Sequence, residues 1–328
     1  MQALLKTNGF IERWIFLIMP VMMIGGMGMS VPLSRLVGWT PLLFMLLTFL
    51  SSLNADYRKL SQLGRRSVLL IAFFALIHLA IPWISSLYAT FLFRSQPDLA
   101  AGMTLASLLP LGVTSIFWVS YNKGNLETAL SLVTLNTLLS PLFVPLTFSL
   151  ILGSLVKLDT ASLFISLLKL VLIPTVLGML VREWLGRRSY AERAWSWWKP
   201  GASVLGKVCL CFIVLLNAAS IASQLHVVSG HAALLVVSVL GMMAIGYALS
   251  YAVARVFAAD RETHIALVYA GGVRNYTVGV VLASAFFTPA AGLPVLVAML
   301  LQHPLALLVH YAFRRRSRAR PTNVANEC

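Results

Sequence analysis

One arginine of this chain lies inside an apolar stretch, where a charge is costly. Arg274 stands in AGGVRNYTVGVVLASAFF, with apolar runs on both sides. An ionised guanidinium within a membrane span costs several kcal/mol unless it faces a cavity or an opposite charge. The ten acidic residues of the chain fall in polar loops or near the ends of apolar runs. A bound anion is therefore an economical counter-ion for Arg274, and the alternatives are snorkelling or bonding to backbone carbonyls at a helix break.

Short polar side chains flank two glycine-rich interruptions of the apolar runs. Thr114 and Ser115 follow PLGV at 110–113, and Asn275 follows Arg274 directly. Such side chains complete the coordination that unwound backbone leaves open, and a helix starting near Asn275 would direct its positive N-terminal end at the same place. Hydroxyls that merely bond their own helix are the alternative. We predict that Arg274, Asn275, Thr114 and Ser115 bind substrate.

Three further polar residues lie within apolar runs, namely His78, Asn136 and His303. A membrane histidine either makes a structural hydrogen bond or exchanges a proton near neutral pH. These residues are candidates for a coupling site or a polar cavity.

Catalytic and metal-binding patterns are missing from the sequence. No span holds a DxxD-like carboxylate pair, and there is no G-x-S-x-G elbow, H-E-x-x-H helix or Walker loop. Clustered carboxylates are what a Mg²⁺-dependent membrane enzyme needs. We therefore expect no enzymatic activity, no metal site and no cofactor.

Membrane helices must position these residues. The 328 residues are 59% hydrophobic and 11% charged, with a mean hydropathy of +0.87. Apolar runs of about 20 residues are long enough to cross the bilayer as helices. We expect an all-α polytopic membrane protein that forms a single membrane domain over 1–328. Ten spans are predicted, near 14–33, 37–54, 67–88, 98–121, 126–154, 160–182, 201–225, 232–257, 264–287 and 290–313.

The basic residues give the spans an orientation. With the N-terminus inside, 19 of the 25 Lys and Arg residues fall in inside segments and three in outside segments. The positive-inside rule then places both termini in the cytoplasm, with residues 314–328 as a basic tail, and we expect the plasma (bacterial inner) membrane. The net charge of +15 is thus explained by basic residues that face the anionic lipids of the cytoplasmic leaflet, and we expect no nucleic-acid partner.

The two halves of the chain resemble each other. WIFLIMPVMMIGGM around Pro20 is similar to LLKLVLIPTVLGML around Pro174, and PLGVTSIF around Gly112 is similar to AGGVRNYT around Gly272. Carriers built from inverted repeats place their substrate between corresponding interrupted helices. We predict two inverted five-helix repeats, about 1–157 and 158–313, with the fourth and ninth helices broken where they cross.

At these motifs the chain resembles the bile acid:sodium symporter family. PLGVTSIFWVSYNKGN and LVTLNTLLSPLFVP resemble that family's fourth and fifth helices, and AGGVRNYTVGVVLASAFF resembles its ninth. The resemblance implies a panel domain of helices 1, 2, 6 and 7, and a core domain of helices 3–5 and 8–10.

The sodium-binding positions that the resemblance implies carry other residues here. One site's polar ligands are replaced by Ile116, Ala129, Val133 and Ala270, and the second site's two glutamines by His78 and Arg274. Sodium needs several oxygen ligands, so these replacements argue against ordinary two-sodium symport.

These observations predict a secondary transporter that moves a small organic anion by alternating access. An inorganic-anion or metalloid exporter of the same fold is one alternative, although the reactive cysteine of arsenite exporters has no counterpart between Pro110 and Asn125. A non-transporting membrane receptor is the other.

Overall fold

The computed structural model describes residues 2–53, 67–153, 159–186, 189–222, 232–258 and 260–318, and these residues form helices joined by short connections. Within these ranges the only β-type pairing is an isolated bridge between Leu111 and Arg274. The expected all-helical membrane protein is confirmed. Six helices are long and apolar enough to cross a membrane, over Val68–Leu92, Leu126–Ile151, Thr160–Gly186, Trp197–Ser220, Ala232–Phe257 and Pro289–Arg315.

The elements follow one another along the chain in a simple order. The first half holds α1 (Gln2–Gly28), α2 (Ser30–Ser34), η1 (Val37–Trp39), α3 (Thr40–Ser52), α5 (Ser67–Ala75), η4 (Leu76–Ala80), α6 (Ile81–Leu92), α7 (Pro97–Leu108), α8 (Thr114–Tyr121) and α9 (Leu126–Leu152). The second half holds α10 (Thr160–Leu167), η5 (Leu168–Leu172), α11 (Ile173–Gly186), α12 (Ser189–Ile221), α14 (Ala232–Phe257), α15 (Arg261–Gly272), α16 (Tyr276–Phe286) and α17 (Pro289–Arg318).

Some helices are longer than their predicted spans. α1 begins at Gln2 and α12 at Ser189, before the expected starts at 14 and 201, because helical hydrogen bonding does not stop where the apolar run stops. α17 continues to Arg318, so the first basic residues of the predicted tail are helical. The predicted repeat boundary at 157–158 and residues 319–328 lie outside the described residues.

Polar side chains fix where several helices begin. Asn125, Asp159, Asp260 and Asn275 are the N-caps of α9, α10, α15 and α16, and each accepts a hydrogen bond from a backbone N–H of the first turn. Such caps satisfy amides that have no partner inside the helix.

Two π-helical turns interrupt otherwise regular helices, and each precedes an Ile-Pro pair. In η4 the Ile81 N–H bonds to the Leu76 carbonyl, directly before Pro82. In η5 the Ile173 N–H bonds to the Leu168 carbonyl, directly before Pro174. A proline has no N–H and its ring crowds the carbonyl four residues earlier, so the helix widens there. His78 lies inside the first of these turns.

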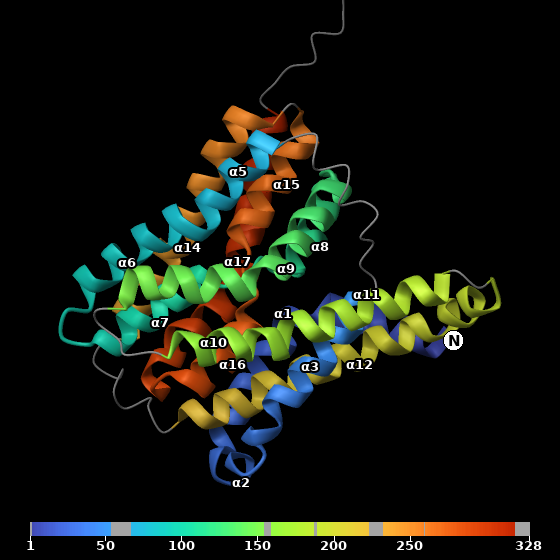
Figure 1. The fold of residues 1–328 in the computed structure, drawn as a ribbon, viewed down its shortest axis with the longest axis horizontal. Helices are drawn as coiled ribbons and strands as arrows, with labels where there is room; N and C mark the ends of the chain where they lie inside the picture. Colours follow the sequence, from blue (N-terminus) through green and yellow to red (C-terminus); the bar gives the residue numbers. More distant parts are fainter. Residues whose placement is uncertain are drawn as a thin grey trace, which may run out of the picture.

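The helices pack in two groups (Figure 1). One group contains α1, α3, α11 and α12, where α12 packs along both α1 and α3 and α11 packs against α3. The other contains the helices α5–α9 and α14–α17, where α7 packs between α6 and α17, and α14 packs on α15. α16 also contacts α12 and α3, so it joins the two groups.

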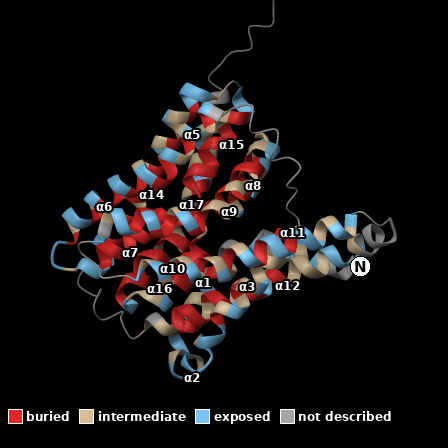
Figure 2. Ribbon diagram, in the orientation of Figure 1, coloured by how far each residue is buried: buried red, intermediate tan, exposed pale blue. Residues whose placement is uncertain are grey.

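Burial is greatest in the interrupted helices α7, α15 and α16 (Figure 2). Every residue of α7 from Leu99 to Leu108 is buried, as is every residue of α16 from Tyr276 to Ala283. Large apolar side chains are instead exposed on α6, α11 and α12, among them Trp83, Leu180 and Phe212. Lipid solvates such apolar surfaces, and the buried polar groups lie in the interior, as in other membrane bundles.

Candidate functional site

The centre of the site is the place where two helix interruptions meet. α7 ends at Leu108 and α8 begins at Thr114, while α15 ends at Gly272 and α16 begins at Tyr276. The two connecting segments run antiparallel: the Gly112 N–H donates to the Val273 carbonyl at 2.9 Å, and the Asn275 N–H donates to the Pro110 carbonyl at 2.8 Å. We call residues 109–113 and 273–275 the crossover.

Glycine at position 112 permits this close approach. A Cβ atom there would lie 2.8 Å from the Arg274 carbonyl oxygen and 2.9 Å from Val273 Cγ1. Contacts of that length with backbone cannot be relieved by a rotamer change. A side chain at position 112 would therefore push the two segments apart.

Arg274 is buried within the crossover and is only partly satisfied. Its side chain is 4% exposed. Nη1 donates to the Leu109 carbonyl over a long 3.4 Å, and Nη2 has no hydrogen-bond partner. Among the described residues no carboxylate pairs with this guanidinium. The backbone carbonyl thus satisfies part of the side chain, and Nη2 stays buried without a hydrogen-bond acceptor.

A chain of hydrogen bonds joins His78 to the same place. Asn136 on α9 accepts from the Leu111 N–H through Oδ1 at 2.8 Å, and its Nδ2 lies 2.7 Å from His78 Nε2. The His78 ring stacks on Phe143 with a centroid distance of 4.7 Å. Since Leu111 is paired with Arg274, the structure brings His78, Asn136 and Arg274 into one connected set.

The other predicted substrate residues surround the crossover in different ways. Ser115, in the first turn of α8, is fully buried and its hydroxyl has no partner. Thr114 is the first residue of α8 and is half-buried. Asn275 caps α16 by accepting from the Val278 N–H at 3.4 Å, so its side chain already has a structural partner. His78 Nδ1, Ser115 Oγ and Arg274 Nη2 are thus three buried, unpartnered polar atoms in or beside the crossover.

His303 belongs to a different cluster. Its ring on α17 lies 6.4 Å from the ring of Trp118, which in turn stacks on Tyr269 at 6.1 Å. Nearby, Asn122 donates to the Tyr269 hydroxyl at 3.0 Å, and this hydroxyl donates to the Ala306 carbonyl at 3.3 Å. This cluster ties α8, α15 and α17 together.

The four positions that the resemblance assigns to sodium lie in an apolar environment. Ala129, Val133 and Ala270 belong to one buried hydrophobic cluster, and Ile116 packs against it. They come from α9, α15 and α8, which contact one another. The side chains of these four residues offer no oxygen ligands, so a cation bound here would have to be held by main-chain carbonyls or by other side chains.

Sequence reasoning missed the main-chain groups of the site. Leu109 and Leu111 are apolar by type, yet the Leu109 carbonyl and the Leu111 N–H bind Arg274 and Asn136. The contact of Tyr247 on α14 with Gly272 was also missed. A Cβ atom on Gly272 would lie only 2.2 Å from Tyr247 Cε1, so the tyrosine ring packs directly against the glycine. The glycine pair at 271–272 was the available signal for such a close approach.

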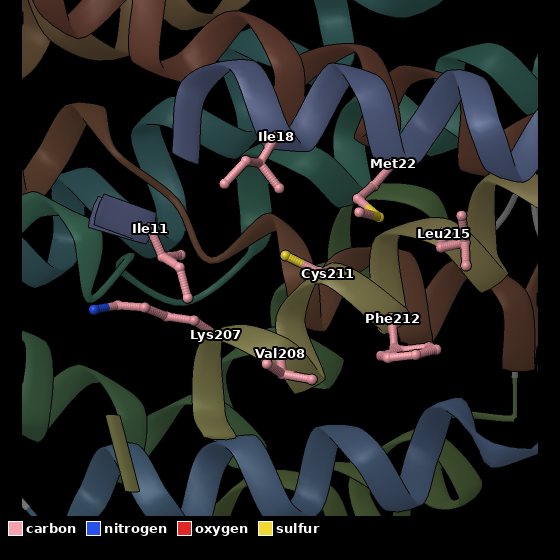
Figure 3. Close-up of a pocket in the computed structure, with 8 residues that line it drawn as sticks. All are labelled: Ile11, Ile18, Met22, Lys207, Val208, Cys211, Phe212 and Leu215. Carbon is pink, nitrogen blue, oxygen red and sulfur yellow. The ribbon is translucent and has the colours of Figure 1, made fainter. Parts of the chain in front are cut away.

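A separate cavity of about 470 Å³ lies between α1 and α12 (Figure 3). Its walls are apolar side chains such as Ile18, Met22 and Phe212. Lys207 also contributes to the lining, and its ammonium group bonds to Asn8 Oδ1. This cavity has no convergent set of polar atoms comparable to that of the crossover.

Comparison with known proteins identifies the family of this chain. The family model described as the Sodium Bile acid symporter family matches residues 40–224. The chain is 31% identical to the uncharacterized protein YbaS of Bacillus subtilis, over 84% of this chain and 88% of that protein. It is 30% identical to YocS of the same organism, named as an uncharacterized sodium-dependent transporter, over 60% of this chain and 59% of that one.

A plant relative extends the comparison. The chain is 28% identical to a protein of Oryza sativa subsp. japonica named as a probable chloroplastic sodium/metabolite cotransporter, BASS2, over 66% of this chain and 50% of that protein. The chain therefore belongs to the sodium bile acid symporter family, whose members are transporters.

Proposed function

We propose that this protein is a secondary transporter that carries an organic anion by alternating access, with Arg274 as the counter-ion of the bound anion. The observation that carries the proposal is the partly satisfied guanidinium at the crossover. Arg274 is 4% exposed, one of its nitrogens has no partner, and no carboxylate among the described residues balances its charge. An anion bound at Nη2 would supply both the opposite charge and the missing hydrogen-bond acceptor.

The surroundings of Arg274 fit a carboxylate or sulfonate better than a cation. The unpartnered Ser115 hydroxyl can donate to an anion, and α16 and α8 both begin at the crossover with their partly positive N-terminal ends. Thr114 and Asn275 lie at these same helix starts and complete the proposed site.

The architecture that we propose has ten spans in two inverted repeats, about 1–157 and 158–313. The packing group of α1, α3, α11 and α12 corresponds to the panel, and the group of α5–α9 and α14–α17 corresponds to the core. In carriers of this kind the substrate site lies between broken helices, and one group rocks against the other. The excess of basic residues in the inside segments supports cytoplasmic termini in the plasma membrane.

We further propose that transport does not depend on sodium. Two of the relatives are named as sodium transporters. In this chain, however, the positions of one sodium site are Ile116, Ala129, Val133 and Ala270, and those of the second are His78 and Arg274. The apolar side chains offer no oxygen ligands, and the charged Arg274 would repel a second cation.

Uptake into proteoliposomes tests this function. Labelled pantoate, a small carboxylate, and taurocholate, a larger sulfonate, are offered with either sodium or potassium outside. Protein-dependent uptake that is equal in both salts is expected. Binding without uptake would indicate a receptor, and uptake that requires sodium would show that a cation site exists elsewhere.

A further inference from the structure

The hydrogen bonds around His78 fix where its proton lies. Asn136 Oδ1 accepts from the Leu111 N–H, so the amide group of Asn136 faces His78 and donates to Nε2. An imidazole nitrogen that accepts a hydrogen bond carries no proton. His78 is therefore neutral in this arrangement, with its proton on Nδ1, and Nδ1 is buried without a partner.

A second proton on His78 is incompatible with these bonds. Protonated Nε2 would bring an N–H against the Asn136 amide N–H₂ at 2.7 Å. Turning the amide would satisfy His78, but it would then present N–H₂ to the Leu111 N–H. Asn136 can therefore hydrogen-bond either to neutral His78 and the Leu111 N–H together, or to protonated His78 alone. Protonation releases the Leu111 N–H, a buried donor at the crossover.

Charge links His78 to the anion site. Arg274 pairs with Leu111, whose N–H bonds to the Asn136 side chain that contacts His78, so a proton on His78 would add a second positive charge to this hydrogen-bonded set. The elements packed most closely on η4 are α5, α6 and α9. Of these, α5 has no titratable side chain, α6 has Tyr88, and α9 has Glu127 in its exposed first turn. An anion on Arg274 would cancel the repulsion, and the released Leu111 N–H would give the anion one more donor.

We propose that His78 is a proton-binding site coupled to the anion site, so that the carrier takes up one proton with each monovalent anion. The proton comes from water on one side, is held on Nε2 while the anion is bound, and leaves with it on the other side. Because the coupling is reciprocal, the anion favours the proton as much as the proton favours the anion. This inference rests on the proposed anion transport.

Proton uptake on binding tests the coupling. Full-length protein in detergent and weak buffer is mixed with pantoate or taurocholate between pH 5 and 8, while calorimetry measures binding and a pH dye measures protons. We expect up to one proton to be taken up per bound anion. In the pH range where His78 is neutral before the anion binds and protonated afterwards, the affinity for the anion should rise about tenfold for each unit by which the pH is lowered. In proteoliposomes a pH gradient, acidic outside, should then drive accumulation.

Three variants locate the proton. His78→Gln should bind the anion without proton uptake. Asn136→Asp should also lose proton uptake on anion binding. A carboxylate at position 136 can accept from the Leu111 N–H and from protonated His78 at the same time, so His78 is already protonated before the anion binds. His264→Gln is the matched control. His264 lies in the first turn of α15, with its ring edge-on to Tyr251 at 4.8 Å, and is not a member of the chain of bonds from His78 through Asn136 to Leu111, so this variant should behave as wild type.

The outcomes separate the two proposals. Anion binding with no proton uptake in the wild type, or unchanged uptake in His78→Gln, would overturn the coupling and leave anion transport standing. Loss of proton uptake in His303→Gln but not in His78→Gln would also overturn the coupling. Binding of neither anion would overturn both.

Discussion

Adding one methyl group at the crossover should weaken anion binding strongly. In Gly112→Ala the new Cβ would lie 2.8 Å from the Arg274 carbonyl oxygen. That oxygen is backbone, so the two segments must separate. The hydrogen bonds from Gly112 to Val273 and from Asn275 to Pro110, at 2.9 and 2.8 Å, would then lengthen or break.

The magnitude follows from these two bonds. A buried backbone group left unpaired costs about 1–3 kcal/mol, and the substitution threatens two such bonds. The proposed site needs the two segments held together, so binding would have to restore this pairing; at a cost of about 2 kcal/mol, the dissociation constant for the anion should rise about 30-fold. The melting temperature should fall by several degrees, because the same bonds join α7–α8 to α15–α16.

Gly246→Ala provides the matched control. Gly246 is buried in α14, and a Cβ there would meet nothing within 4 Å. Alanine is favoured over glycine inside helices by about 1 kcal/mol, so this variant should bind as wild type and melt no lower. Calorimetry with pantoate and a thermal-shift assay measure both quantities. If Gly112→Ala matched Gly246→Ala in affinity and melting temperature, the reasoning about the crossover would be wrong.

Two other substitutions probe different parts of the protein. The pKa of Asp159 is lowered by hydrogen bonds from the Ser162 hydroxyl and from the Ser162 and Ala161 amides, so its capping of α10 is present above about pH 4 and is lost as the pH falls through the depressed value. Asp159→Ala should therefore melt below wild type at pH 7, and the difference should shrink under acid; a pH-independent difference in thermal shift would count against the cap. Ser284→Ala removes the hydroxyl of α16 that donates to Asn217 Oδ1 on α12 at 2.8 Å, a bond between the two packing groups. We expect this variant to have a changed turnover number but an anion affinity within about twofold of wild type, because a bond across a moving interface acts on the motion. An altered affinity with an unchanged turnover number would argue against rocking at this interface.

The sequence was informative about where the helices are interrupted. Glycine and proline at 110–112 and 271–272 predicted the breaks, and the helices do stop at Leu108 and Gly272. Arg274 was recognisable because a charge inside an apolar run requires an explanation. These signals are local, since they depend on residue type and on immediate neighbours.

The connections between these residues were not predictable in the same way. His78 and Asn136 are 58 positions apart, and their bond depends on how α9 packs against η4. The pairing of Asn136 with the Leu111 N–H involves the main chain, which leaves no trace in residue type. His303 had the same signal as His78, a histidine in an apolar run, yet packing places it beside Trp118. Tertiary packing, which a single sequence does not encode in any short pattern, decides such cases.

Anion binding by Arg274→Ala tests the central claim most directly. Losing one partner of a buried charge pair costs about 2–5 kcal/mol, so affinity for pantoate or taurocholate should fall about 30-fold or more. Arg94→Ala is the control, because Arg94 is exposed and lies over the Phe91 ring at 5.0 Å. Calorimetry on both purified variants should show a strong loss of anion affinity for Arg274→Ala and none for Arg94→Ala. The melting temperature of each variant checks that it is folded. Wild-type affinity in a folded Arg274→Ala protein would contradict the assignment of Arg274 as the counter-ion.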